Sequence, residues 1–186
     1  MSIYRIDRNI QGFMFFTIND LDVVNKMEDF DISGFGQPLN FKWVAPEANF
    51  LSDDSEPEVL PDITQWSGSD LIFKNEVRKI FDDLLTSIGD FLPLAGTCEE
   101  FWMFNPTQRA GNQIVNLEET KSAYFDDGSW KEIEKLTLTL DAESKVPCLF
   151  TADIDEGVNL YCTEAFKAKY ENNNLGGLLF EKIDQN

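Results

Sequence analysis

The chain of 186 residues contains no histidine. Histidine is the only side chain whose unperturbed pKa lies near neutral pH, and it is a frequent metal ligand. Its absence excludes a serine–histidine–aspartate triad and a cysteine–histidine pair. It also excludes histidine-ligated zinc and iron sites. Carboxylate and lysine chemistry stay open from composition alone, but we expect no enzyme, no catalytic residue, no metal and no cofactor.

Basic residues are scarce. Fifteen Lys and Arg stand against 34 Asp and Glu, which gives a formal net charge of −19. Such a charge repels nucleic-acid phosphates and anionic membrane surfaces, so neither is an expected partner. A protein with a basic surface is the natural complement, because long-range attraction raises the rate of encounter. The alternative is that the acidity serves only solubility.

Cysteines and long apolar runs are few as well. The three cysteines, Cys98, Cys148 and Cys162, form no CxxC pair, so neither a disulfide framework nor a zinc ribbon is indicated. Their apolar surroundings are typical of buried, reduced thiols in a cytosolic protein. No apolar run approaches the ~18 residues that a membrane-spanning helix requires. The short run at 13–16 lacks the cleavage site of a signal peptide. We therefore expect a cytoplasmic protein.

Apolar residues at steps of three and four indicate one main helix over about 74–88. The residues of this stripe are Phe73, Val77, Ile80, Phe81, Leu84, Leu85 and Ile88. Gly89 is expected to end the helix in a left-handed conformation. A second, short helix is predicted over about 163–172, with Thr163 as its N-cap.

Most other segments alternate between apolar and polar residues, which is typical of strands. The predicted strands cover 2–8, 41–44, 90–94, 99–104, 147–152, 158–162 and 178–180. An Asp-Gly turn at 126–129 predicts a hairpin whose second arm continues through Leu136, Leu138 and Leu140. The fold class is therefore α+β, with a mainly antiparallel sheet. We expect a single domain over 1–186, with room for a small N-terminal subdomain over 1–50.

Residues 52–62 form the most polar stretch, with five acids, two prolines and no base. This acidic loop is either a solvated linker or a contact surface for a partner. Aromatic side chains near such a surface usually carry much of the binding energy. The predicted partner-binding residues are Asp53, Asp54, Glu56, Glu58, Asp62 and Trp66. A second set of acids, Glu118, Glu119, Asp126 and Asp127, is the alternative location.

Five short motifs follow one another along the chain: Pro61-Asp62-Ile63-Thr64, 89–94, 101–105, the hairpin turn at 125–128, and the ending from Phe166 to 174–180. Over roughly 40–183 the chain thereby resembles a family of bacterial immunity proteins encoded beside polymorphic toxins. The resemblance implies a protein that protects its own cell, or sibling cells, by binding a cognate toxin domain. The motifs identify a fold rather than a site, and no catalytic residue carries over.

If the toxin is a nuclease, its cleft must be basic to hold phosphate, and an acidic protein can cover that cleft. Two other hypotheses stay open. One is a carboxylate-based hydrolase or sugar-binding module, which needs two carboxylates about 5–10 Å apart in a cleft. The other is a general acidic adaptor or chaperone.

Overall fold

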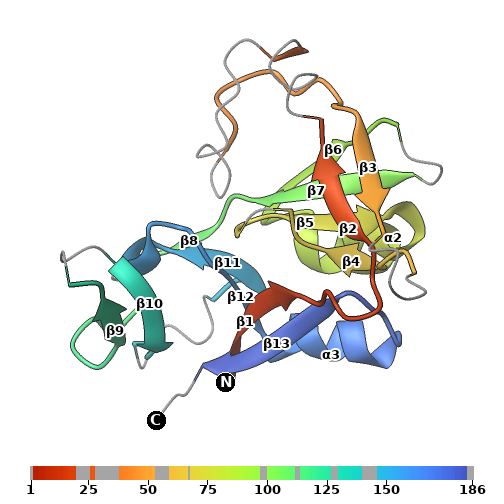
Figure 1. Ribbon diagram of the computed structural model, residues 1–186. Coiled ribbons are helices and arrows are strands. Elements are labelled where there is room, and N and C mark those ends of the chain that lie inside the picture. Colours follow the sequence, from red (N-terminus) through yellow and green to blue (C-terminus); the bar gives the residue numbers. More distant parts are fainter. Residues whose placement is uncertain are drawn as a thin grey trace.

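The computed structural model describes residues 2–19, 26–27, 38–52, 59–66, 68–96, 100–111, 114–126, 130–139 and 146–183 (Figure 1). These residues form a single-domain α+β fold in which nearly all strand pairs are antiparallel, as the sequence predicts. None of the helices in the described ranges is long and apolar enough to cross a lipid bilayer. The smaller N-terminal subdomain stays a prediction.

One sheet brings the two ends of the chain together. Its strand order is β13-β1-β12-β11-β8, and only the pair of β11 with β8 is parallel. The strands are β1 (Ile3–Arg8), β8 (Arg109–Ala110), β11 (Leu149–Ala152), β12 (Leu160–Thr163) and β13 (Leu178–Ile183). A one-turn 3-10 helix, η2 (Asp153–Asp155), follows β11, and α3 (Glu164–Asn172) connects β12 to β13.

The second sheet is built from the middle of the chain. Its strand order is β4-β5-β7-β6, and all three pairs are antiparallel. The strands are β4 (Ile63–Thr64), β5 (Leu71–Lys74), β6 (Gly89–Pro93) and β7 (Phe101–Pro106), with α2 (Asn75–Leu85) between β5 and β6.

Two further strand pairs stand outside these sheets. They are β2 (Phe15–Ile18) with β3 (Ala48–Leu51), and the hairpin of β9 (Lys121–Tyr124) with β10 (Trp130–Lys135). Figure 1 shows the hairpin at the far left, at the opposite end of the molecule from β6 and β3.

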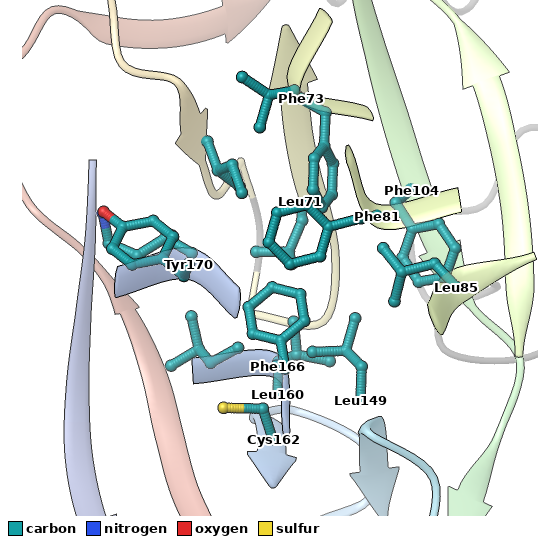
Figure 2. Close-up of a cluster of buried hydrophobic side chains, with 14 of the residues drawn as sticks. Leu71, Phe73, Phe81, Leu85, Phe104, Leu149, Leu160, Cys162, Phe166 and Tyr170 are labelled. Carbon is teal, nitrogen blue, oxygen red and sulfur yellow. The ribbon is translucent and has the colours of Figure 1, made fainter. Parts of the chain in front are cut away.

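The main core lies where the two helices meet. Phe81 of α2 faces Phe166 of α3, with ring centroids 4.9 Å apart (Figure 2). Phe73 of β5 and Leu160 of β12 close the cluster from the two sheets, and all four side chains are fully buried. Burial of large apolar side chains is the dominant stabilising term in folding, so this contact fixes one sheet against the other.

Both predicted helices form, but the expected end of the first one is wrong. Helix α2 stops at Leu85, and Gly89 begins β6 instead of adopting a left-handed conformation. A side chain at Gly89 would approach the carbonyl oxygen of Asn105 to 2.4 Å, so glycine is needed for close strand packing. Thr163 occupies the N-cap position of α3, but its side chain makes no capping hydrogen bond.

Two strand predictions are also wrong. Residues 41–44 form no strand, because no described strand pairs with their backbone. The side chain of Trp43 instead packs against a buried apolar cluster, and its indole N–H donates to the carbonyl of Pro93 at 2.8 Å. The second arm of the hairpin ends at Lys135 rather than continuing to 140. Leu138 forms only an isolated bridge with Val115, and Leu140 lies outside the described residues.

Candidate functional site

The predicted contact residues separate into two groups. Asp53, Asp54, Glu56 and Glu58 lie outside the described residues, as does Asp127 of the alternative set. Asp62 and Trp66 are described, and the structure places them in different surroundings.

The carboxylate of Asp62 is engaged inside the protein. Its Oδ2 accepts a hydrogen bond from the N–H of Gly176 at 2.9 Å, and its Oδ1 lies 3.5 Å from Nζ of Lys74. The backbone N–H of Asp62 donates to the carbonyl of Gly176 at 3.0 Å. Asp62 therefore ties the start of β4 to the connection between α3 and β13. Its arrangement is that of a structural clamp.

Trp66 lies half-buried at the edge of a surface groove of about 540 Å³. The groove is lined by Asp7, Arg8, Ile10, Gln65, Trp66, Gly68 and Leu179. The backbone N–H of Trp66 donates to the carboxylate of buried Asp70 at 3.0 Å, which fixes the turn that carries the indole. Among the described residues, Asp7 is the one carboxylate of this lining, so the described part of the chain does not place two carboxylates in this groove.

A second groove, of about 610 Å³, lies beside the hairpin. It is lined by Leu117, Thr120, Lys121, Ser122, Tyr124, Glu134 and Ile154. Two apolar side chains of this lining are largely exposed, Leu117 (48%) and Tyr124 (60%), and so is Phe125 (54%), which follows Tyr124 in the chain. Exposed acids lie next to them in the chain or in the groove itself. These are Glu118, Glu119, Asp126 and Glu134.

We call this surface the hairpin face: Leu117, Glu118, Glu119, Tyr124, Phe125, Asp126 and Glu134. The sequence predicts three of its acids as an alternative location but not its apolar centre. The usual expectation for a hairpin is a polar face toward solvent. The two adjacent aromatic residues Tyr124 and Phe125, directly before the Asp-Gly turn, were the signal in the sequence from which exposed apolar side chains could have been predicted.

The hairpin face is held by hydrogen bonds and by buried residues beneath it. The side-chain Oδ1 of Asn116 accepts the N–H groups of Glu118 and Glu119 at 3.1 and 3.4 Å, which fixes the turn after Leu117. Ile133 and Leu136 are buried in an apolar cluster below the hairpin.

A further candidate for chemistry is the buried titratable group Asp155. Asp155 is fully buried, and burial raises its pKa. Its carboxylate accepts hydrogen bonds from the O–H of Tyr161 (2.7 Å), the side chain of Asn159 (2.9 Å) and the N–H of Gly157 (3.2 Å). These three donors satisfy the carboxylate and favour its charged form, which opposes the effect of burial.

Cys148 and Cys162 are poorly suited to nucleophilic chemistry, and Cys98 lies outside the described residues. Burial raises the pKa of Cys148 to about 11, and burial raises the pKa of Cys162 as well. A thiol with a raised pKa carries little thiolate at neutral pH. Within the described ranges no three Cys, Asp or Glu side chains gather closely enough to hold a metal ion.

No protein-family model matches the sequence. No curated protein matches it either. The case for a function therefore depends on the surfaces described above.

Proposed function

We propose that this chain is an immunity protein that binds a cognate bacterial toxin domain through a basic surface of that toxin and thereby neutralises it. The observation that carries the proposal is the way in which the scarce bases are used. Arg5, Lys74, Arg109, Lys167 and Lys169 each pair with a carboxylate of the same chain. Among the described residues, most of the carboxylates outside these pairs are exposed, so the acid that these cations do not neutralise faces solvent there.

An uncompensated acidic surface has a direct consequence for binding. It attracts a cationic protein over a distance of about a Debye length, roughly 8 Å at physiological ionic strength. Association steered in this way reaches about 10⁸–10⁹ M⁻¹s⁻¹ at low salt. A toxin that acts on nucleic acid presents such a cationic cleft, and carboxylates can occupy the positions that phosphates would take.

The test is protection of living cells. The toxin domain encoded immediately upstream is expressed in a sensitive bacterial strain, with and without this protein. Survival of the toxin-expressing cells only when this protein is also expressed supports the proposal, provided that the purified pair also forms a stable complex. Cell death at equal expression levels, together with no complex, would show that the proposal is wrong.

Salt dependence tests the electrostatic part separately. The association rate constant with the purified toxin domain is expected to fall by at least about tenfold between 50 and 500 mM NaCl, because salt screens long-range attraction. The dissociation rate constant should change much less. An association rate that is independent of salt would remove electrostatic steering from the account while leaving binding itself intact.

A further inference from the structure

The hairpin face differs from an ordinary solvent-facing hairpin because it has several exposed apolar side chains. Single exposed apolar side chains are common and need no explanation. Here two exposed apolar side chains, Leu117 and Tyr124, line the same groove, and Phe125, the next residue along the chain, is exposed as well. Gathered apolar surface next to a groove is a feature of binding sites.

The face is also preformed. Asn116 fixes the turn that presents Leu117, Glu118 and Glu119. The hydroxyl of Thr120 accepts the N–H of Thr137 at 3.1 Å, which joins this turn to the segment after β10. A surface that is ordered before binding loses less conformational entropy when a partner docks.

Charge decides which partner fits. Glu118 and Glu119 follow Leu117, Asp126 follows Phe125, and Glu134 lies inside the groove beside Lys121. We call these four exposed acids the border, because each lies near one of the apolar residues along the chain or in the groove. A second copy of this chain would place like charges opposite each other, which is unfavourable. A partner with Arg and Lys side chains would satisfy the border, and an Arg guanidinium can also stack on the ring of Tyr124 or Phe125.

We infer that the hairpin face is the surface on which the basic face of the cognate toxin docks. Tyr124 and Phe125 are the apolar anchors, and the four acids of the border orient the partner's cations. This inference rests on the proposed function and adds the location of the contact. It places the contact on a part of the chain remote in sequence from the acidic loop at 52–62.

Four variants separate the contributions. Tyr124→Ser with Phe125→Ser removes the anchors, and Val44→Ser with Val158→Ser is its control, because those residues are exposed apolar side chains that line neither groove. The border is neutralised by changing all four acids to their amides: Glu118→Gln, Glu119→Gln, Asp126→Asn and Glu134→Gln. Its control neutralises four exposed acids elsewhere: Glu76→Gln, Asp82→Asn, Asp90→Asn and Glu100→Gln. The border variant and its control have the same net charge.

The probe is the purified, catalytically inactivated toxin domain encoded immediately upstream, with association and dissociation measured on an optical biosensor. Loss of two central aromatic anchors should raise the dissociation rate at least about tenfold. The border variant should associate at least about threefold more slowly than its equal-charge control. Thermal melting followed by circular dichroism checks that each variant is folded, and Phe125→Ser alone replaces the double variant if that one unfolds.

Each outcome has a distinct meaning. If the wild-type protein binds and the hairpin variants bind like their controls, the toxin docks elsewhere and the inference is overturned while the proposed function stands. If the wild-type protein binds no toxin domain, the proposed function itself fails. If sedimentation shows a dimer that the Tyr124→Ser and Phe125→Ser variant dissolves, the face serves self-association instead, which also overturns the inference.

Discussion

Asp62 and Gly176 bind each other through two hydrogen bonds, although 114 positions separate them in the chain. The carboxylate of Asp62 accepts the N–H of Gly176, and the N–H of Asp62 donates to the carbonyl of the same glycine. Ile63 donates to that carbonyl as well, at 3.2 Å. The two motifs at 61–64 and 174–180 therefore meet in space, and together they join the second sheet to the last strand of the first sheet.

Replacement of Asp62 by Ala should destabilise the protein. The change leaves the N–H of Gly176 without its acceptor and Lys74 without its nearby carboxylate. Hydrogen bonds to a charged group contribute about 1.5–3 kcal/mol each, so we expect the free energy of unfolding to fall by about 2 kcal/mol. Urea denaturation followed by fluorescence measures the change.

Two further variants establish the cause. Asp62→Asn keeps an acceptor oxygen and should recover part of the loss. Glu76→Ala removes an exposed acid and should change the free energy of unfolding by less than about 0.5 kcal/mol. An Asp62→Ala variant as stable as wild type would show that the clamp contributes nothing and would return Asp62 to the set of candidate contact residues.

Replacement of the adjacent glycine, Gly177, should destabilise the protein more than replacement of Asp62. Gly177 has φ +110°, and a Cβ there would approach the carbonyl oxygen of Ile63 to 2.1 Å. Gly177→Ala therefore combines a disfavoured backbone with a collision, and should lower the free energy of unfolding by about 3 kcal/mol. Gly12 is the matched control, because it has φ +74° and open space around its Cα. Gly12→Ala should lower it by only about 1 kcal/mol. Equal losses in urea denaturation would mean that the close approach at Gly177 is unimportant.

Local patterns predicted the elements whose own residues decide their structure. The part of the apolar stripe from Val77 to Leu85 forms α2, and the period-two alternation at 101–104 forms β7, because each pattern reports the face that is buried. The end at Gly89 was wrong because two different demands select glycine. A left-handed helix end and a close strand approach both exclude a side chain, and only the partner strand at Asn105 distinguishes them.

Long-range relationships explain the other differences. Trp43 looks like part of a strand, but a hydrogen bond to Pro93, 50 positions away, holds its segment in an irregular conformation. The same limit applies to the candidate site. The sequence shows that Asp62 and Trp66 are close along the chain, yet Asp62 faces Gly176 whereas Trp66 faces a groove with Leu179. The exposure of Tyr124 likewise depends on tertiary structure, because the burial of Ile133 decides which face of the hairpin is left toward solvent. The local alternation of apolar and polar residues did not reveal it.

Removal of the Tyr161 hydroxyl should destabilise the protein in a pH-dependent way. The O–H of Tyr161 donates to the buried carboxylate of Asp155 and thereby lowers the pKa that burial has raised. Because the native pKa lies above the unfolded value of about 3.9, the contribution of Asp155 to stability falls as pH rises between the two values. Tyr161→Phe raises the native pKa further, so this fall becomes larger.

The expected loss for Tyr161→Phe is about 2 kcal/mol at pH 8, and smaller as the pH falls toward the native pKa of Asp155. Urea denaturation at several pH values from 5 to 8 measures it. Tyr170→Phe is the control, since the hydroxyl of Tyr170 accepts the N–H of Leu178 and involves no charge. Its loss should not vary with pH over the same range. A Tyr161→Phe loss that is equally constant would mean that the protonation of Asp155 does not change over this range in either variant, and would contradict the expected rise of its pKa.

The rate of alkylation should distinguish the buried cysteines of the native protein from fully exposed thiols. At pH 8, Cys148 and Cys162 should react with iodoacetamide at least about tenfold more slowly than a model thiol, because burial raises both pKa values and limits access. In 8 M urea both should react at the rate of the model thiol. Mass spectrometry of timed samples gives the rates. Rapid modification of Cys162 in the native protein would contradict its position in the core.

The acidic loop should act mainly on the rate of encounter. Neutralising Asp53, Asp54, Glu56 and Glu58 to their amides is expected to slow association with the toxin domain by about three- to tenfold at low salt, because attraction between acidic charges and a basic partner steers the approach. The dissociation rate should stay near the wild-type value if the anchors lie on the hairpin face. At 1 M salt, where the Debye length is about 3 Å, the difference should largely disappear.

The equal-charge variant at Glu76, Asp82, Asp90 and Glu100 shows how much of the effect is net charge alone. A loop variant that dissociates faster than this control would mean that the loop touches the toxin directly, and the contact surface would then have to include it.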